Sequence, residues 1–197
     1  MIVGATLKSV NVTILLMLLI ISIYFDLKER RIPNFLTFPV ILWGLISACI
    51  FSGLDGAIFN GSGFLVGLAV FFIPFAFGAI GAGDVKLMAA IGALMGYKFV
   101  LNTAVITAIA GGIIVVVNSL INGTLYRVLK NISMFIVKGI LFIAYKAFMN
   151  VNLYNKYKSI NLQLSKQDKK YIPYAVAIGV GAVIVLSGQL EGKMPFR

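Results

Sequence analysis

Two aspartates stand out in a chain that offers few other reactive groups. Asp26 follows a long uncharged run and precedes a basic segment, and Asp84 ends the sequence Gly81-Ala82-Gly83-Asp84 between two apolar runs. The chain has no histidine and a single cysteine, Cys49, so it lacks the commonest zinc ligand and any possible internal disulfide. We therefore expect no metal and no cofactor, and hydrolytic chemistry would depend on carboxyl groups.

A pair of carboxyl groups can hydrolyse a peptide bond without a covalent intermediate. When two of them lie close together, repulsion keeps one protonated near neutral pH while the other stays charged. The charged group takes a proton from water, and the protonated group donates one to the peptide carbonyl oxygen. We predict that Asp26 and Asp84 are this catalytic pair. A helix start at Asp84 would favour its ionised form, which makes Asp26 the expected proton holder.

The residues around Asp84 suggest supporting roles. Gly81 and Gly83 place no side chain beside the aspartate, so an extended substrate backbone could approach it. Lys86 could act on the nearby carboxylates or reach lipid headgroups, and we favour the headgroups. Structural alternatives remain for both acids: Asp26 could be a helix-end acid paired with Arg30, and Asp84 could be a helix cap.

The composition indicates the elements that must position these residues. Hydrophobic residues make up 60% of the 197 residues, charged residues 12%, and the mean hydropathy is +1.02, far from the balance of a soluble domain. We predict an all-α membrane protein, a single polytopic bundle of about six transmembrane helices. The predicted spans are 5–25, 35–52, 62–80, 84–97, 99–122 and 171–190. No small-residue cleavage site follows the first run, so we expect a retained helix rather than a signal peptide.

The distribution of cations orients these spans. Placing the segment after Asp26 in the cytosol leaves only Lys8, Lys98, Lys193 and Arg197 of the 17 Lys and Arg on the opposite side, as the positive-inside rule requires. Asp26 and Asp84 then reach the same cytosolic face of the cytoplasmic membrane. The net charge of +11 indicates orientation and contact with anionic lipids rather than nucleic acid binding.

The segment 124–150 is apolar but repeatedly interrupted by cations. Arg127, Lys130 and Lys138 fall near one helical face, with aliphatic residues over much of the rest, the pattern of an amphipathic helix lying in the membrane interface. A seventh span is the alternative. We expect residues 151–170 to form a basic cytosolic loop.

The two aspartate segments together resemble a known family. Asp26-Leu-Lys-Glu-Arg-Arg-Ile-Pro-Asn34 and Gly81-Ala-Gly-Asp-Val-Lys-Leu87 are similar to the paired signature of the type IV prepilin leader peptidases, membrane aspartic proteases of the GxGD type. Ile172-Pro173-Tyr174-Ala175, at the start of the last predicted span, fits the same resemblance. It implies that Asp26 and Asp84 are catalytic and that the substrate is a pilin precursor cut on the cytosolic side after a short basic leader.

The resemblance is closest to the short forms that process Flp/Tad-type pilins, with preflagellin peptidases a similar alternative. The larger members carry paired cysteines and a methyltransferase activity, and with one cysteine in this sequence we expect no methyl transfer. Two other functions remain open: a small cation-coupled transporter using the two acids, and a noncatalytic membrane protein of pilus assembly. The sequence does not indicate an oligomeric state.

Overall fold

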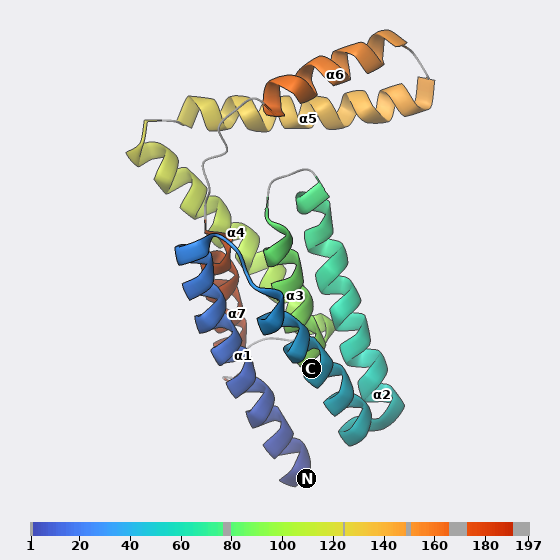
Figure 1. Ribbon diagram of the computed structural model, residues 1–197, viewed down its shortest axis with the longest axis vertical. Helices are drawn as coiled ribbons and strands as arrows, with labels where there is room; N and C mark the ends of the chain where they lie inside the picture. The colour runs from blue at the N-terminus through green and yellow to red at the C-terminus, as the bar shows by residue number, and fades with distance from the viewer. Residues whose placement is uncertain (1, 77–79, 124, 149–150, 166–172, 191–197) are drawn as a thin grey trace. The chain divides into compact units, whose positions relative to one another are not determined.

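A computed structural model of the chain describes residues 2–76, 80–123, 125–148, 151–165 and 173–190 (Figure 1). Every regular element in these residues is a helix, which confirms the predicted all-α class. The helices are α1 (Ile2–Glu29), α2 (Asn34–Ala76), α3 (Ala82–Met95), α4 (Tyr97–Ile121), α5 (Leu125–Phe148), α6 (Val151–Ser165) and α7 (Tyr174–Leu190).

The chain divides into two compact units. Residues 1–112 and 173–197 form the first unit, and residues 113–172 form the second. Parts of four predicted segments lie outside the described residues: 77–79 of the third span, 124 and 149–150 of the amphipathic segment, 166–170 of the basic loop, and 171 and 172 of the last span. Lys193 and Arg197, used to orient the chain, also lie outside them.

Helix α2 is a hairpin of two helical arms rather than one straight rod. Gly53 has φ 62° and ψ −148°, a backbone conformation open almost only to glycine. The Asn60 side-chain amide donates to the Gly44 carbonyl oxygen at 3.2 Å, although 16 residues of straight helix would span about 24 Å. The arms match the predicted spans 35–52 and 62–80. Between these two spans the non-helical backbone is confined to Gly53, and the residues that follow it are helical.

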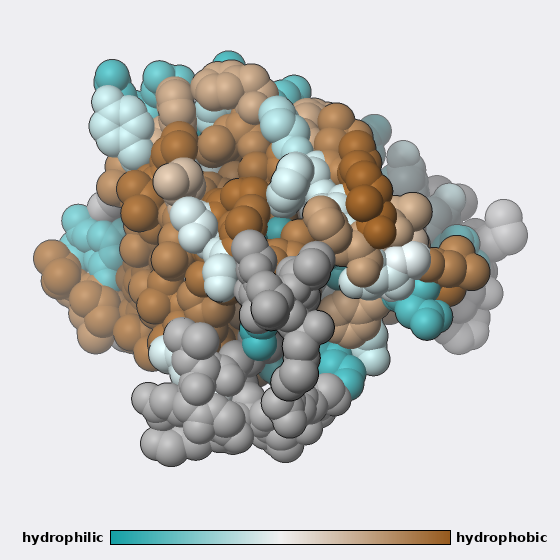
Figure 2. All heavy atoms as spheres, turned by 90° about the horizontal axis from the view of Figure 1, so that it is seen from below, coloured by the Kyte–Doolittle hydropathy of each residue, from teal (hydrophilic) through white to brown (hydrophobic). Residues whose placement is uncertain are grey.

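Three helices are long and apolar enough to cross a bilayer, among the residues described. They are Leu7–Glu29 of α1, Asn34–Ala76 (α2) and Tyr97–Ile121 (α4), and α7 contains a shorter apolar helix, Tyr174–Gly188. The 14 residues of α3 extend only about 21 Å, less than the hydrocarbon thickness of about 30 Å. Hydrophobic residues occupy much of the surface visible in Figure 2, as expected of a protein whose solvent is lipid. The total number of crossings stays a prediction.

Helix α3 forms the centre of the first unit. Its side chains from Leu87 to Ile91 are fully buried, and its contact with α2 is the most extensive between the described helices. Glycines make this approach possible: a Cβ on Gly63 would meet the Gly92 carbonyl oxygen, and one on Gly92 would meet Gly63. The small residues of Gly63-xxx-Gly67 and Gly92-xxx-Gly96 thus serve close helix packing within the chain.

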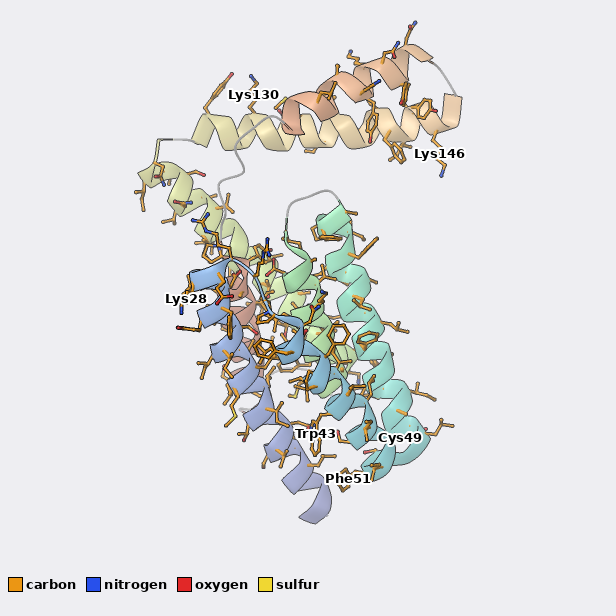
Figure 3. The ribbon with its side chains drawn as sticks, viewed as in Figure 1. Lys28, Trp43, Cys49, Phe51, Lys130 and Lys146 are labelled. Atoms are coloured by element: carbon orange, nitrogen blue, oxygen red, sulfur yellow. The ribbon has the colours of Figure 1, made fainter. Side chains whose placement is uncertain are left out.

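The second unit contains two antiparallel helices. The segment predicted to be an amphipathic helix is α5, and Figure 3 shows its Lys130 and Lys146 side chains pointing away from the helix axis. Where we expected a basic loop, residues 151–165 form α6. Aromatic pairs explain the difference, since Phe142 meets Tyr157 at 5.6 Å and Tyr145 meets Tyr154 at 5.2 Å between ring centroids.

Candidate active site

The fold brings Asp26 and Asp84 together from two different helices. Asp26 lies in the last turn of α1, and Asp84 lies in the first turn of α3. Their exposed fractions are only 2% and 6%, and they are close enough for the charge of Asp26 to act on the Asp84 carboxyl. Helix α1 extends past the predicted span to Glu29, so Asp26 is held by a helical backbone. Two buried acids within electrostatic range of each other form a potential acid–base pair.

Asp26 is anchored by the amino-terminal end of α7. Its Oδ2 accepts the backbone N–H of Ala175 at 3.0 Å, a buried contact between residues far apart in the sequence. The first amides of a helix have no partner within the helix and carry partial positive charge, so they suit a carboxylate. The end of α1 is fixed one turn further on, where the Arg30 N–H donates to the Asp26 carbonyl oxygen at 3.1 Å and Arg30 adopts φ 56°.

Asp84 is anchored by its own helix start. Its Oδ2 accepts the Gly81 N–H at 2.9 Å, and its N–H donates to the Gly81 carbonyl oxygen at 3.2 Å. This reciprocal arrangement is the capping pattern that begins a helix. Because Asp26 faces the start of α7 in the same way, both carboxyls receive an amide at a helix amino terminus. The dipole argument that made Asp26 the proton holder therefore applies equally to both acids.

The two glycines of the motif differ in their surroundings. A Cβ on Gly83 would lie 3.1 to 3.3 Å from atoms of Ile32, so the loop between α1 and α2 packs directly against Gly83. A Cβ on Gly81 would meet only Asp84 Oδ2 and Gly83 N, at ordinary contact distances of 3.4 and 3.9 Å, and Gly81 is exposed. Gly83 thus has a packing role, while no described residue crowds a Cβ at Gly81.

Lys86 joins the two sequence motifs. Its Nζ donates to the Asn34 side-chain oxygen at 2.7 Å, a contact within the protein. Contact of Lys86 with lipid headgroups stays a prediction. Asn34 is the first residue of α2 and ends the segment that begins at Asp26. The loop carrying Ile32 is therefore tied to α3 at Gly83 and again at Lys86.

The sequence analysis considered only the carboxyl groups and did not predict that α7 binds one of them. Ala175 binds Asp26 through its backbone, which leaves no signal in the side chain. Tyr174 lies within electrostatic range of Asp84, and its ring meets Phe71 of α2 at 6.3 Å between centroids. The sequence did contain one signal, Pro173 followed by a helical pattern. This signal marks the start of a helix but does not show which side chain the helix start binds.

The described residues contain no group of three or more His, Cys, Asp or Glu side chains placed to hold a metal ion. Cys49 is an exposed free thiol.

Two comparisons with known proteins give a match. A model of the type IV leader peptidase family matches residues 13–116, a range that includes Asp26, Asp84 and the Lys86–Asn34 contact. The chain is also 29% identical over 126 residues to a prepilin leader peptidase/N-methyltransferase of Legionella pneumophila. That alignment covers 61% of this chain and 44% of the relative, so the chain spans less than half the length of that protein. No solved structure gives a significant match. With more than half of its residues matched by the family model, the chain belongs to the type IV leader peptidase family.

Proposed function

We propose that this protein is a membrane-embedded aspartic endopeptidase that removes the short basic leader from type IV prepilin precursors of the Flp/Tad kind. The observation that supports this most directly is the meeting of Asp26 and Asp84, two buried acids from α1 and α3, in a chain of the leader peptidase family. The name of the Legionella relative supports a prepilin as the substrate class. The cleavage would take place at the cytosolic face of the cytoplasmic membrane.

The proposed reaction is addition of water to the peptide carbonyl. One acid, in its charged form, removes a proton from water, and the other donates its proton to the carbonyl oxygen of the scissile bond. Collapse of the resulting diol returns a proton to the leaving amine and releases the leader. The charge of Asp26 acts on the Asp84 carboxyl, so in this proposal the two acids exchange protons as a coupled pair.

The surroundings of the pair support this chemistry. Each carboxyl receives a backbone amide, from Ala175 or from Gly81, and these donors hold the side chains in fixed positions before substrate arrives. No described residue crowds a Cβ built at Gly81, next to Asp84, and an extended substrate backbone would approach there. We propose that Gly81 admits the substrate and that Gly83 and Lys86 fix the adjoining loop.

Co-expression with a candidate prepilin tests the proposal. Asp26→Asn and Asp84→Asn keep the size of each side chain but remove its acid, and we expect leader removal to stop in both, as judged by the mass of the pilin. Asp55→Asn is the matched control, because Asp55 is an exposed acid in the second arm of α2. All three proteins must be found in the membrane fraction in equal amounts. Normal processing by either of the first two variants would overturn the assignment.

A further inference from the structure

The first unit contains a cavity near the end of α1 that lies away from the acids. Its volume is about 520 Å³, within the range of small-molecule sites. The cavity is lined by α1, both arms of α2 and the end of α3, and its polar lining residues are Lys8, Asn11, Ser52, Asp55 and Asn60. In Figure 3, Phe51 lies toward this end of the unit and Lys28 toward the other. Lys8 and Asp26 are separated by about 27 Å of helix, so the cavity is distinct from the candidate active site.

Side-chain hydrogen bonds hold the walls of the cavity together. Asn11 of α1 donates to the Leu94 carbonyl oxygen of α3 at 3.3 Å, and its own side-chain oxygen accepts the indole N–H of Trp43 in α2 at 3.1 Å. Asn60 joins the two arms of α2 through its bond to the Gly44 carbonyl oxygen at 3.2 Å. Asn11 and Asn60 are each only 8% exposed. The cavity is therefore formed before a ligand arrives, which reduces the free energy spent on ordering its walls.

Two opposite charges lie at the cavity. Lys8 and Asp55 are both exposed, and neither forms an ion pair with a described residue. No described residue donates to the side-chain oxygen of Asn60, which stays available as an acceptor. The lining thus offers a cationic donor, a carboxylate and a further acceptor. A ligand that carries both an anionic group and a primary ammonium would satisfy all three, because a primary ammonium donates up to three hydrogen bonds.

The surroundings of these polar groups are apolar. Phe59, Leu94 and Met95 line the cavity, and on the neighbouring turns of α2 the residues Leu54 and Ile58 are 76% and 61% exposed. A small soluble zwitterion would leave Leu54 and Ile58 uncovered, whereas the acyl chains of a lipid would cover them. The combination of charge and apolar surface therefore favours a lipid.

We propose that this cavity binds the headgroup of a phospholipid that carries ethanolamine phosphate, with Lys8 on the phosphate and Asp55 and Asn60 on the ammonium group. Lys8 lies at the edge of Leu7–Glu29, the part of α1 long and apolar enough to cross a bilayer, which is the depth at which headgroups begin. A choline headgroup has no N–H to donate, and a glycerol headgroup leaves Asp55 without a cation, so both should bind more weakly. The bound lipid joins α1, α2 and α3 and takes no part in hydrolysis. The inference does not depend on the proposed peptidase function.

Titration of the purified protein in detergent with phosphatidylethanolamine, followed by native mass spectrometry, tests the proposal. We expect one bound lipid per chain, with a dissociation constant about tenfold lower than for phosphatidylcholine or phosphatidylglycerol. The midpoint of thermal unfolding should rise with the concentration of this lipid. Equal affinity for the three lipids would overturn the proposal. Free phosphoethanolamine should compete only weakly, and competition at the same concentration as the lipid would overturn the lipid as the source of the headgroup.

Three variants at the cavity should weaken this binding. Asp55→Asn and Lys8→Met should each raise the dissociation constant for phosphatidylethanolamine about tenfold. Ser52→Trp, at an exposed position, should obstruct the cavity while keeping both charges. Glu29→Gln and Lys28→Met remove exposed charges at the other end of α1 and are the matched controls. Wild-type affinity in any of the three cavity variants would overturn the inference. Because binding is measured without a substrate, that result would leave the proposed function untouched.

Discussion

Lys86 Nζ donates to the Asn34 side-chain oxygen at 2.7 Å, and this contact ties the start of α2 to the first turns of α3. Asp84 lies two residues before Lys86, and Asn34 ends the loop that follows Asp26. The hydrogen bond therefore links the two segments that supply the acids. Its partners come from motifs that are far apart in the sequence, so it depends on the fold.

Removing this hydrogen bond should hold the two acid-bearing segments together less firmly while leaving both acids in the chain. Lys86→Met and Asn34→Leu should each reduce the cleavage rate about fivefold, because a hydrogen bond to a charged group is lost. The double variant should be no slower than the worse single variant, since both remove the same contact. Initial rates in isolated membranes measure this. Lys8→Met changes an exposed lysine near the far end of α1 and should be neutral; fully additive effects at 34 and 86 would argue against the link.

Alanine substitutions should separate the roles of the two motif glycines. Gly83→Ala places a Cβ 3.1 Å from Ile32 Cβ, so we expect a loss of about 1–2 kcal/mol in unfolding free energy together with slower cleavage. Gly81→Ala meets no such obstacle among the described residues and should cost less, about 0.5 kcal/mol, because Gly81 is the N-cap of α3 and alanine is a poorer N-cap than glycine. A rise in KM for Gly81→Ala would support its role in admitting substrate. Thermal unfolding in detergent and cleavage kinetics give both quantities, and equal stability losses at the two positions would be inconsistent with the packing described.

The amino-acid sequence was informative where chemistry or hydropathy constrains residue type. Asp26 and Asp84 could be singled out because an acidic side chain in a membrane-spanning chain costs free energy, so the few acids present indicate a function. The predicted spans also place both residues at one membrane boundary. The contact of Ala175 with Asp26 was not predictable, because any residue but proline could supply that amide. The helix over 151–165 was missed because its cations suggested a loop, whereas its tyrosines pack on α5.

The hairpin of α2 should depend on Gly53. Its φ of 62° and ψ of −148° are strained for any residue with a Cβ, so Gly53→Ala should lower the unfolding free energy by about 1–3 kcal/mol. Gly61→Ala provides the comparison, because nothing lies within 4 Å of a Cβ at Gly61. Thermal unfolding of the two variants measures the difference. Equal stability would mean that the chain reverses without the glycine.

The approach of α2 to α3 should be equally sensitive at Gly92. An added Cβ there would meet the backbone of Gly63, and backbone atoms cannot move aside as a flexible side chain can. We expect Gly92→Ala to separate the two helices, reduce stability by about 1–3 kcal/mol and slow cleavage through displacement of Asp84. Gly139→Ala in α5, where nothing lies within 4 Å, should leave both unchanged. The same unfolding and cleavage assays apply, and a fully stable Gly92→Ala protein would contradict the close contact.

The joint action of Asp26 and Asp84 is tested most directly by single-turnover cleavage of a prepilin with purified wild-type protein, Asp26→Asn, Asp84→Asn and the double variant. If the two acids work as one unit, replacing either should reduce the rate by about a thousandfold, and the double variant should be no slower than either single variant. A near-normal rate in either single variant, or a double variant slower by the product of the two single effects, would contradict the account.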